Sequence, residues 1–306
     1  MKVIFWGHKH NYNTFYYIHY AYSKAFKHLG YEVYWIDKTD LSNFVNFYFK
    51  DTIFFTEGSA SDNEPIPLIP GCLYILHNCN HKKYLDAGCK IINLCNYVRY
   101  CEDGMSFNYK ETGNTVEKIK DFVFYDKKAF AMYQPWATDL LPYEIDVNQI
   151  VLHDENKPDF HFIGTIWQEN VNQVNPFVKS CIDHRKNFKP YARISFEDAN
   201  RLVKESYIDV DFRGDWGKEC GFIPCRIWKD ISYGRLVGTN SYYINRAFSN
   251  MLPYNNDTYG LFETTVYSQK NMSTGEMVKL KTYIKNNHTY INRINDILEY
   301  ADVLYK

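Results

Sequence analysis

The fold class is decided at the beginning of the chain, where residues 2–37 read KVIFWGHKHNYNTFYYIHYAYSKAFKHLGYEVYWID. The apolar run at residues 2–6 predicts a strand, and the amphipathic stretch at 15–29 predicts a helix closed by Gly30. A second apolar run at residues 32–36 predicts another strand. Strand, helix and strand in this order form a βαβ unit, whose two strands are parallel. Because the first turn lacks the GxGxxG pattern, the unit does not indicate dinucleotide binding.

The alternation of strands and helices continues to the end of the chain. Further strands are predicted at residues 52–56, 72–76, 90–94, 121–125, 159–163, 191–194, 208–212 and 236–239. Helices are predicted at residues 171–186, 196–206, 224–233 and 274–304, and a loop is predicted at 257–268. This alternation predicts parallel sheets whose functional loops follow the carboxyl ends of the strands.

A polar stretch near the middle of the chain interrupts the alternation and predicts a linker at residues 134–158. We therefore expect an α/β protein of two Rossmann-like domains with parallel sheets and a cleft between them. The N-terminal domain would take residues 1–140, and the C-terminal domain would take residues 141–285. Residues 286–306 would form a C-terminal helix that packs back on the N-terminal domain.

Composition excludes several classes of protein. The chain has 306 residues, of which 45% are hydrophobic and 23% charged, so it can build a core and is not disordered. Its net charge is −1 and no basic block occurs, so we expect no nucleic-acid partner. No apolar run is long enough for a transmembrane segment or an export signal, so we expect a cytoplasmic protein. The eight cysteines form no CxxC pair, which predicts reduced thiols and no metal site.

Residues 221–234, GFIPCRIWKDISYG, contain the strongest candidate for an anion site. Pro224 is typical of the first turn of a helix, and Arg226 and Lys229, three residues apart, share one face of that turn. Free backbone N–H groups, the helix dipole and two cations all favour a diphosphate. The alternative is a solvated basic face, but the apolar residues on both sides of the pair favour the diphosphate.

Three segments, at residues 159–165, 196–207 and 221–241, resemble the C-terminal domain of GT-B glycosyltransferases, especially a bacterial and viral spore-maturation-like group. The sequences GFIPCRIWKDISYGRLVGTNS and PWATDLLP carry most of this resemblance. In that family the C-terminal domain binds a nucleotide-diphospho-sugar. By resemblance, the diphosphate would contact Gly164, Thr165, Arg226 and Lys229, and the nucleotide or sugar would contact Ser232, Tyr233 and Asn240. Trp216, between two glycines, is a further candidate for stacking on the base or sugar, with a packed loop anchor as the alternative.

The candidate catalytic groups are histidines in the N-terminal half. Many retaining relatives carry a pair of glutamates around the helix at 224–233, and this chain has none, which favours an inverting transfer. Such a transfer needs a general base for the proton of the acceptor hydroxyl, and neutral imidazole suits that task. Candidates for the base are His10, His8 and His77, and candidates for acceptor contacts are Asn11, Tyr12 and Asn78. For each histidine the alternative is a solvated loop residue.

The sequence therefore predicts a glycosyltransferase that moves a hexose-type sugar from a nucleotide-diphospho-sugar donor to a glycan or other hydroxyl acceptor. The cations would stabilise the leaving diphosphate, so no metal and no cofactor are expected. Two other possibilities stay open: a sugar-nucleotide epimerase or phosphorylase on the same fold, and a non-catalytic nucleotide- or glycan-binding protein. The sequence does not indicate the donor base, the acceptor or the oligomeric state.

Overall fold

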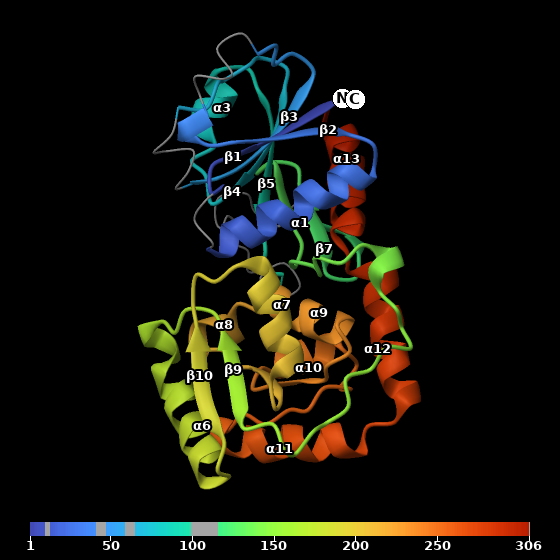
Figure 1. Cartoon of the computed structure of the whole chain (residues 1–306). Coiled ribbons are helices and arrows are strands. Elements are labelled where there is room, and N and C mark those ends of the chain that lie inside the picture. The colour runs from blue at the N-terminus through green and yellow to red at the C-terminus, as the bar shows by residue number, and fades with distance from the viewer. Residues whose placement is uncertain (10–12, 41–46, 59–64, 99–115, 306) are drawn as a thin grey trace. The chain divides into compact units, whose positions relative to one another are not determined.

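The computed structural model describes residues 1–9, 13–40, 47–58, 65–98 and 116–305. The chain divides into two compact units, drawn in Figure 1. Unit 1 consists of Met1–Pro135 together with Tyr290–Lys306, and unit 2 consists of Trp136–Thr289. The chain therefore passes between the units twice, once in each direction.

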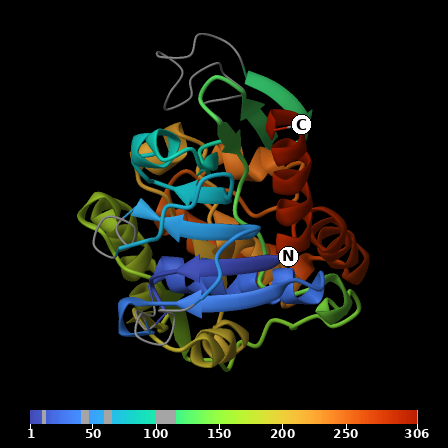
Figure 2. The same ribbon diagram turned by 90° about the horizontal axis from the view of Figure 1, so that it is seen from above.

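Unit 1 is built on an eight-stranded sheet with the strand order β2-β1-β3-β4-β5-β8-β7-β6. Its strands are β1 (Lys2–Trp6), β2 (Glu32–Ile36), β3 (Thr52–Glu57), β4 (Leu73–His77), β5 (Lys90–Cys95), β6 (Val116–Lys120), β7 (Val123–Asp126) and β8 (Ala131–Tyr133). All pairings from β2 across to β8 are parallel, as the alternating pattern predicted. Figure 2 shows neighbouring strands of this sheet from above.

The strand expected at 121–125 runs in the opposite direction from the prediction. It is β7, which pairs antiparallel with both β6 and β8. Only Asp121 and Phe122 separate β6 from β7, and Phe122 has a positive φ of 62°. Two residues can close a hairpin but cannot make the long crossover that a parallel pair needs.

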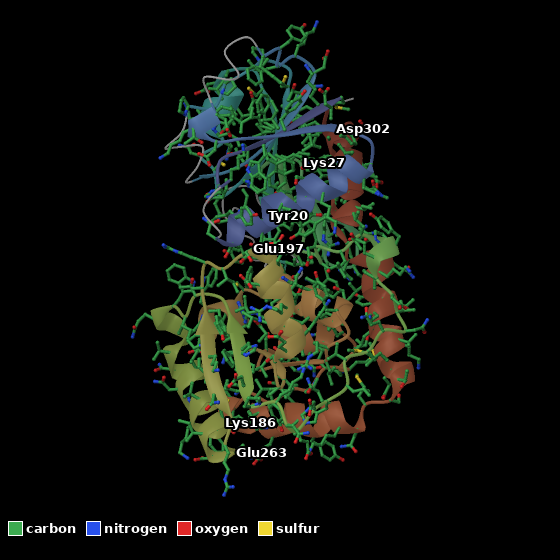
Figure 3. The ribbon with its side chains drawn as sticks, viewed as in Figure 1. Tyr20, Lys27, Lys186, Glu197, Glu263 and Asp302 are labelled. Carbon is green, nitrogen blue, oxygen red and sulfur yellow. The ribbon has the colours of Figure 1, made fainter. Side chains whose placement is uncertain are left out.

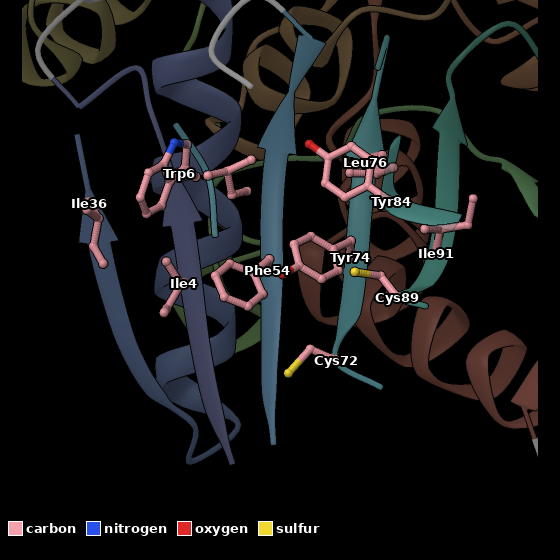
Figure 4. Packing of buried hydrophobic residues seen from close by; sticks show 11 residues of the cluster. Ile4, Trp6, Ile36, Phe54, Cys72, Tyr74, Leu76, Tyr84, Cys89 and Ile91 are labelled. Atoms are coloured by element: carbon pink, nitrogen blue, oxygen red, sulfur yellow. The ribbon is translucent and has the colours of Figure 1, made fainter. Parts of the chain in front are cut away.

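The core of unit 1 is aromatic and lies on both faces of the parallel strands. On one face, the rings of Phe54 and Tyr74 on neighbouring strands stack with centroids 4.6 Å apart, and Figure 4 shows them among the buried residues of this cluster. On the other face lies helix α1 (Thr14–His28), whose Tyr22 packs 4.6 Å from Phe55. Because these strands are covered on both faces, their sequences are apolar runs rather than alternating patterns.

The C-terminal tail is broken where one uninterrupted helix was expected at 274–304. It forms α12 (Thr274–Asn287) in unit 2 and α13 (Tyr290–Tyr305) in unit 1. The break falls at His288 and Thr289, where the Thr138 N–H donates to the His288 carbonyl at 3.1 Å. In unit 1, Tyr300 of α13 donates a hydrogen bond to the Asp126 carbonyl at 3.0 Å, which fixes α13 beside β7.

Unit 2 carries two parallel strand pairs surrounded by helices. The strands are β9 (Asp159–Ile163) with β10 (Asn187–Tyr191), and β11 (Asp209–Asp211) with β12 (Val237–Thr239). The helices are α6 (Val171–Asp183), α7 (Phe196–Glu205), α8 (Asp215–Glu219), α9 (Cys225–Ser232), α10 (Tyr242–Ala247), α11 (Thr258–Asn271) and α12. The strand predicted at 191–194 lies earlier in the chain, because Asn187–Tyr191 is the stretch that pairs in register with β9.

Residues 257–268 form most of helix α11 and not the expected loop. The Asp257 side chain caps this helix by accepting hydrogen bonds from the first backbone N–H groups. Helix α11 packs against α6, and its Glu263, labelled in Figure 3, lies 3.2 Å from His184 Nε2. The stretch lacks a strong apolar stripe, which is why its periodicity did not reveal a helix.

Candidate functional site

The first candidate site lies in unit 2, where the carboxyl ends of β9 and β11 meet the first turn of α9. Arg226 belongs to that turn, and its Nη2 donates a hydrogen bond to the Ile163 carbonyl at the end of β9. Its guanidinium lies 4.4 Å from the ring centroid of Phe162, and its Nη1 lies 3.4 Å from Asp211 Oδ1. Burial lowers the pKa of Arg226, and the Asp211 carboxylate opposes that shift. One side chain therefore connects α9 to both strands.

Gly164 follows β9 directly and touches this guanidinium. It has a positive φ of 148°, and a β-carbon at this position would lie 2.7 Å from Arg226 Nη2. A glycine is therefore required here for two reasons, the backbone conformation and the close approach of the arginine. Thr165, the next residue, is exposed. The structure thus brings Gly164 and Arg226 together from positions far apart in the sequence.

A second arginine, Arg213, shares the same carboxylate. Asp211 ends β11 with a fully buried side chain, and its Oδ2 accepts a hydrogen bond from Arg213 Nε at 2.7 Å. Its Oδ1 is paired with Arg213 Nη2 and with Arg226 Nη1. Two guanidiniums on one carboxylate leave one positive charge in excess, and their side chains are 14% and 19% exposed. Such an arrangement can donate several charge-assisted hydrogen bonds to an anion.

Arg213 is a site residue that was not predicted from the sequence. Its position in the sequence could have identified it, because Arg213 directly follows the strand predicted at 208–212 and precedes Gly214. Functional groups of parallel sheets gather after strand ends, so an arginine at that point is a candidate for anion binding.

The Asn240 side chain fixes the backbone of Arg213 by two hydrogen bonds. It is fully buried, its Oδ1 accepts the Arg213 N–H at 2.7 Å, and its Nδ2 donates to the Arg213 carbonyl at 3.0 Å. Asn170 supports the same loop by accepting the Gly214 N–H at 3.0 Å. Asn240 was predicted as a contact for the nucleotide or sugar; the structure uses its amide to position the backbone of Arg213.

Other predicted residues lie further along α9. Lys229 Nζ lies 4.8 Å from the ring centroid of Phe196. The Ser232 hydroxyl, at the opposite end of α9 from Arg226, donates to the Lys229 carbonyl and lies 2.7 Å from Thr138 Oγ1. Tyr233 donates to Asp139 Oδ2 at 2.8 Å, and burial raises the pKa of its phenol. The hydroxyls of these two residues therefore bond to residues 138–139 and not to the arginine pair.

Trp216 lies on the short helix α8, which begins two residues after Arg213. Its side chain is exposed, with 41% of the residue surface accessible. An exposed indole suits stacking on a flat ring, and Trp216 follows Arg213 by three residues in the chain.

The second candidate site lies in unit 1, at the carboxyl ends of three adjacent parallel strands. His8 follows β1, Glu57 ends β3 and His77 ends β4, where Glu57 and His77 are register partners. His8 Nε2 lies 3.0 Å from Glu57 Oε2, and both side chains are buried. His8 has a positive φ of 61°, a conformation that costs on the order of 1–3 kcal/mol for a residue other than glycine. Strain of this kind is concentrated at functional sites.

Aromatic rings pack around this pair. The ring of Phe15 lies 5.1 Å from the His8 ring and 5.5 Å from the His77 ring, and His19 lies 5.6 Å from His8. Burial lowers the pKa of His77 to about 4, and burial together with the neighbouring His8 lowers the pKa of His19 to about 3. Both imidazoles are therefore neutral at physiological pH.

The remaining predicted residues of unit 1 lie in two loops. His10, Asn11 and Tyr12 fall outside the described residues. Asn78 follows His77, is exposed and has a positive φ of 54°. Its carbonyl oxygen would lie 2.0 Å from a β-carbon on Gly58, so this loop packs tightly against the residue after Glu57. Glu57 itself was not predicted, because nothing in its local sequence distinguishes it from an ordinary strand-end residue.

Within the described ranges, no group of three or more histidine, cysteine, aspartate or glutamate side chains could hold a metal ion. Among the helices of the described residues, none combines the length and apolar character of a membrane-spanning segment.

No protein-family model and no curated protein matches the chain. Solved structures do share its fold. One, described as alpha-glucosyltransferase (AGT) in complex with UDP, has a TM-score of 0.61 at 10% identity and covers 100% of this chain and 99% of that chain. Two others are alpha-glucosyltransferase complexes with UDP and a 13-mer DNA, one with a central A:G mismatch and one with an HMU base. Their TM-scores are both 0.56, at 11% and 10% identity with the same coverage.

The likeness extends over the whole chain and establishes the fold, which is that of GT-B glycosyltransferases. The narrower resemblance to the spore-maturation-like group stays a prediction.

Proposed function

We propose that the protein is a glycosyltransferase that takes a sugar from a nucleoside-diphosphate donor, with a UDP-sugar as the first candidate. One observation carries the proposal: Arg213 and Arg226 share the buried Asp211 carboxylate beside Gly164. This arrangement leaves a positive charge at the carboxyl ends of parallel strands, where a leaving diphosphate would gain negative charge. The fold likeness to UDP-bound glucosyltransferases supports the choice of uridine.

Within this proposal, unit 1 supplies the general base. The acceptor oxygen attacks C1 of the donor sugar, the bond from C1 to the diphosphate oxygen breaks, and its electron pair leaves with the nucleotide. The hydroxyl proton passes to His8, and the Glu57 carboxylate at 3.0 Å stabilises the imidazolium that forms. A single displacement of this kind inverts the anomeric centre. The two guanidiniums supply the charge stabilisation, so we propose that transfer needs no metal ion.

For the acceptor we propose a glycan or another hydroxyl compound. Two of the similar structures are complexes with DNA, which makes a hydroxyl on a nucleobase the competing candidate. The net charge of −1 argues for a neutral acceptor, because binding to a phosphate backbone gains most of its affinity from cationic side chains.

The test is release of nucleoside diphosphate from UDP-, GDP-, ADP- and dTDP-sugars, with and without acceptors. The acceptors are oligosaccharides and duplex DNA containing hydroxymethylated bases, and each reaction is repeated with EDTA. Acceptor-dependent release is the expected result, and NMR of the product assigns the anomer. Conversion of the donor without release would mean an epimerase, and binding without turnover would mean a binding protein. His8→Gln should abolish transfer but leave UDP affinity unchanged, with the exposed His28→Gln as the matched control.

A further inference from the structure

Asn13 makes two hydrogen bonds that together fix its orientation. It is the N-cap of α1, and its Oδ1 accepts the Tyr16 N–H at 2.9 Å. With the oxygen held by the helix, the amide nitrogen faces His8 and lies 3.2 Å from Nδ1. A carboxamide nitrogen donates hydrogen bonds and does not accept them. Nδ1 of His8 must therefore be the acceptor, which means that it carries no proton.

The other ring nitrogen of His8 is assigned by the same reasoning. Nε2 lies 3.0 Å from Glu57 Oε2, and a carboxylate accepts hydrogen bonds, so Nε2 carries the proton. The two contacts select the neutral Nε2–H tautomer. A carboxylate partner on its own would favour the charged imidazolium. Asn13 opposes this, because a proton on Nδ1 would face a second donor at 3.2 Å.

The groups around His8 come from each neighbouring element. Glu57 is on β3, His77 is on β4, and His19 is on α1 with its ring 5.6 Å away. Asp37, after β2, accepts the backbone N–H of Lys9 at 3.1 Å. Both other histidines are neutral at physiological pH, and the Glu57 carboxylate and the Asn13 amide each contact one ring nitrogen of His8.

We propose that Asn13 is a positioning residue that selects the tautomer of His8 and places its basic lone pair on Nδ1. The acceptor hydroxyl then takes the place of the Asn13 amide and gives its proton to Nδ1, while Nε2–H stays bonded to Glu57. This use of the lone pair rests on the proposed function of His8 as the base. The tautomer rests only on the contacts of His8 with Asn13 and Glu57.

The tautomer is tested by ¹⁵N NMR of the histidine rings in the intact protein at pH 7, without substrate, with His8→Gln used to assign the signal. Wild-type protein should show an unprotonated Nδ1 and a protonated Nε2. Asn13→Asp keeps the helix cap but replaces the donor with an acceptor, so both nitrogens should become protonated. Asn13→Ser also keeps the cap and should raise the doubly protonated fraction. An Nδ1–H signal in the wild type, or an unchanged spectrum in Asn13→Asp, would overturn the assignment.

The catalytic consequence is tested by the pH profile of transfer. Asn13→Asp should lower kcat by about tenfold or more at pH 7, recover at higher pH, and leave UDP affinity unchanged. A merely structural role would lower kcat equally at every pH, and that result would refute the positioning role. If the spectrum is as expected but His8→Gln retains full transfer, the tautomer stands and the base assignment fails.

Discussion

Arg226 Nη2 packs against Gly164 so closely that a β-carbon at position 164 would lie only 2.7 Å from it. Only glycine, which has no β-carbon, leaves room for this guanidinium. The guanidinium cannot move away cheaply, because the Ile163 carbonyl and the Asp211 carboxylate hold it. The loop after β9 and the first turn of α9 are therefore fitted to each other at this contact.

Gly164→Ala should destabilise unit 2 and weaken UDP binding. The added methyl group collides with a fixed guanidinium, and the positive φ of 148° adds backbone strain, together roughly 1–3 kcal/mol. Urea unfolding and UDP titration measure the two effects. Gly275→Ala in α12 is the matched control, since a β-carbon there meets nothing within 4 Å and should stabilise the helix by roughly 0.5–1 kcal/mol. Equal stability of the two variants would contradict the clash.

Arg213→Gln and Arg226→Gln should each reduce UDP affinity by about 10- to 100-fold, the effect of about one charge-assisted hydrogen bond of 1.5–3 kcal/mol. Asp211 keeps one arginine partner in either variant, so the fold should survive. Isothermal titration with UDP measures the change. Arg201→Gln is the control, because this exposed arginine of α7 pairs with Asp198 and Glu205 of its own helix. An unchanged affinity in both test variants would remove the diphosphate assignment.

Glu57→Gln should lower kcat by about 100-fold, within the range expected for general-base catalysis, with little change in UDP affinity. The amide oxygen still accepts the Nε2–H bond, so His8 keeps its place, but the charge that stabilises the imidazolium is gone. Steady-state kinetics measure kcat and KM separately. Glu32→Gln, an exposed glutamate on β2, should behave as wild type. A Glu57→Gln enzyme with full kcat would exclude the pair from the reaction.

His19→Phe should make the protein less sensitive to acid. The folded-state pKa of His19 is about 3, below its ordinary value of 6.5, so the unfolded chain takes up a proton that the folded protein does not. The stability that depends on neutral His19 is complete above pH 6.5 and is lost as the pH falls toward about 3. Below pH 6.5 this loss approaches about 1.4 kcal/mol per pH unit for one histidine.

Urea unfolding at pH 7.5, 6 and 5 measures that slope. Phenylalanine fits the site, because the His19 ring already packs 5.3 Å from Phe55 and 5.7 Å from Phe5. The variant should lose less stability between pH 7.5 and 5 than the wild type, whatever its stability at pH 7.5. The exposed His28→Gln should leave the slope unchanged. Identical slopes in wild type and His19→Phe would show that His19 is not responsible.

Elements with a strong local pattern were predictable from sequence. The strand at Lys2–Trp6 and the strand at Glu32–Ile36 have the expected bounds, and α1 differs by one residue at each end from the predicted 15–29. Elements without such a local pattern could not be predicted from the sequence. Helix α11 has apolar residues spread around it, and the direction of β7 depends on a two-residue turn.

The sequence by itself determined the α/β fold class and drew attention to single residues such as Arg226 and His8, because strand runs, helix periodicity and helix-start signals are local. The tertiary structure alone decided what those residues face. Arg226 pairs with Asp211, which lies 15 residues away and also binds Arg213, and His8 pairs with Glu57, which lies 49 residues away. Such pairs form only when strands that are distant in the chain come into register, and the charge, tautomer and protonation of a group depend on those partners.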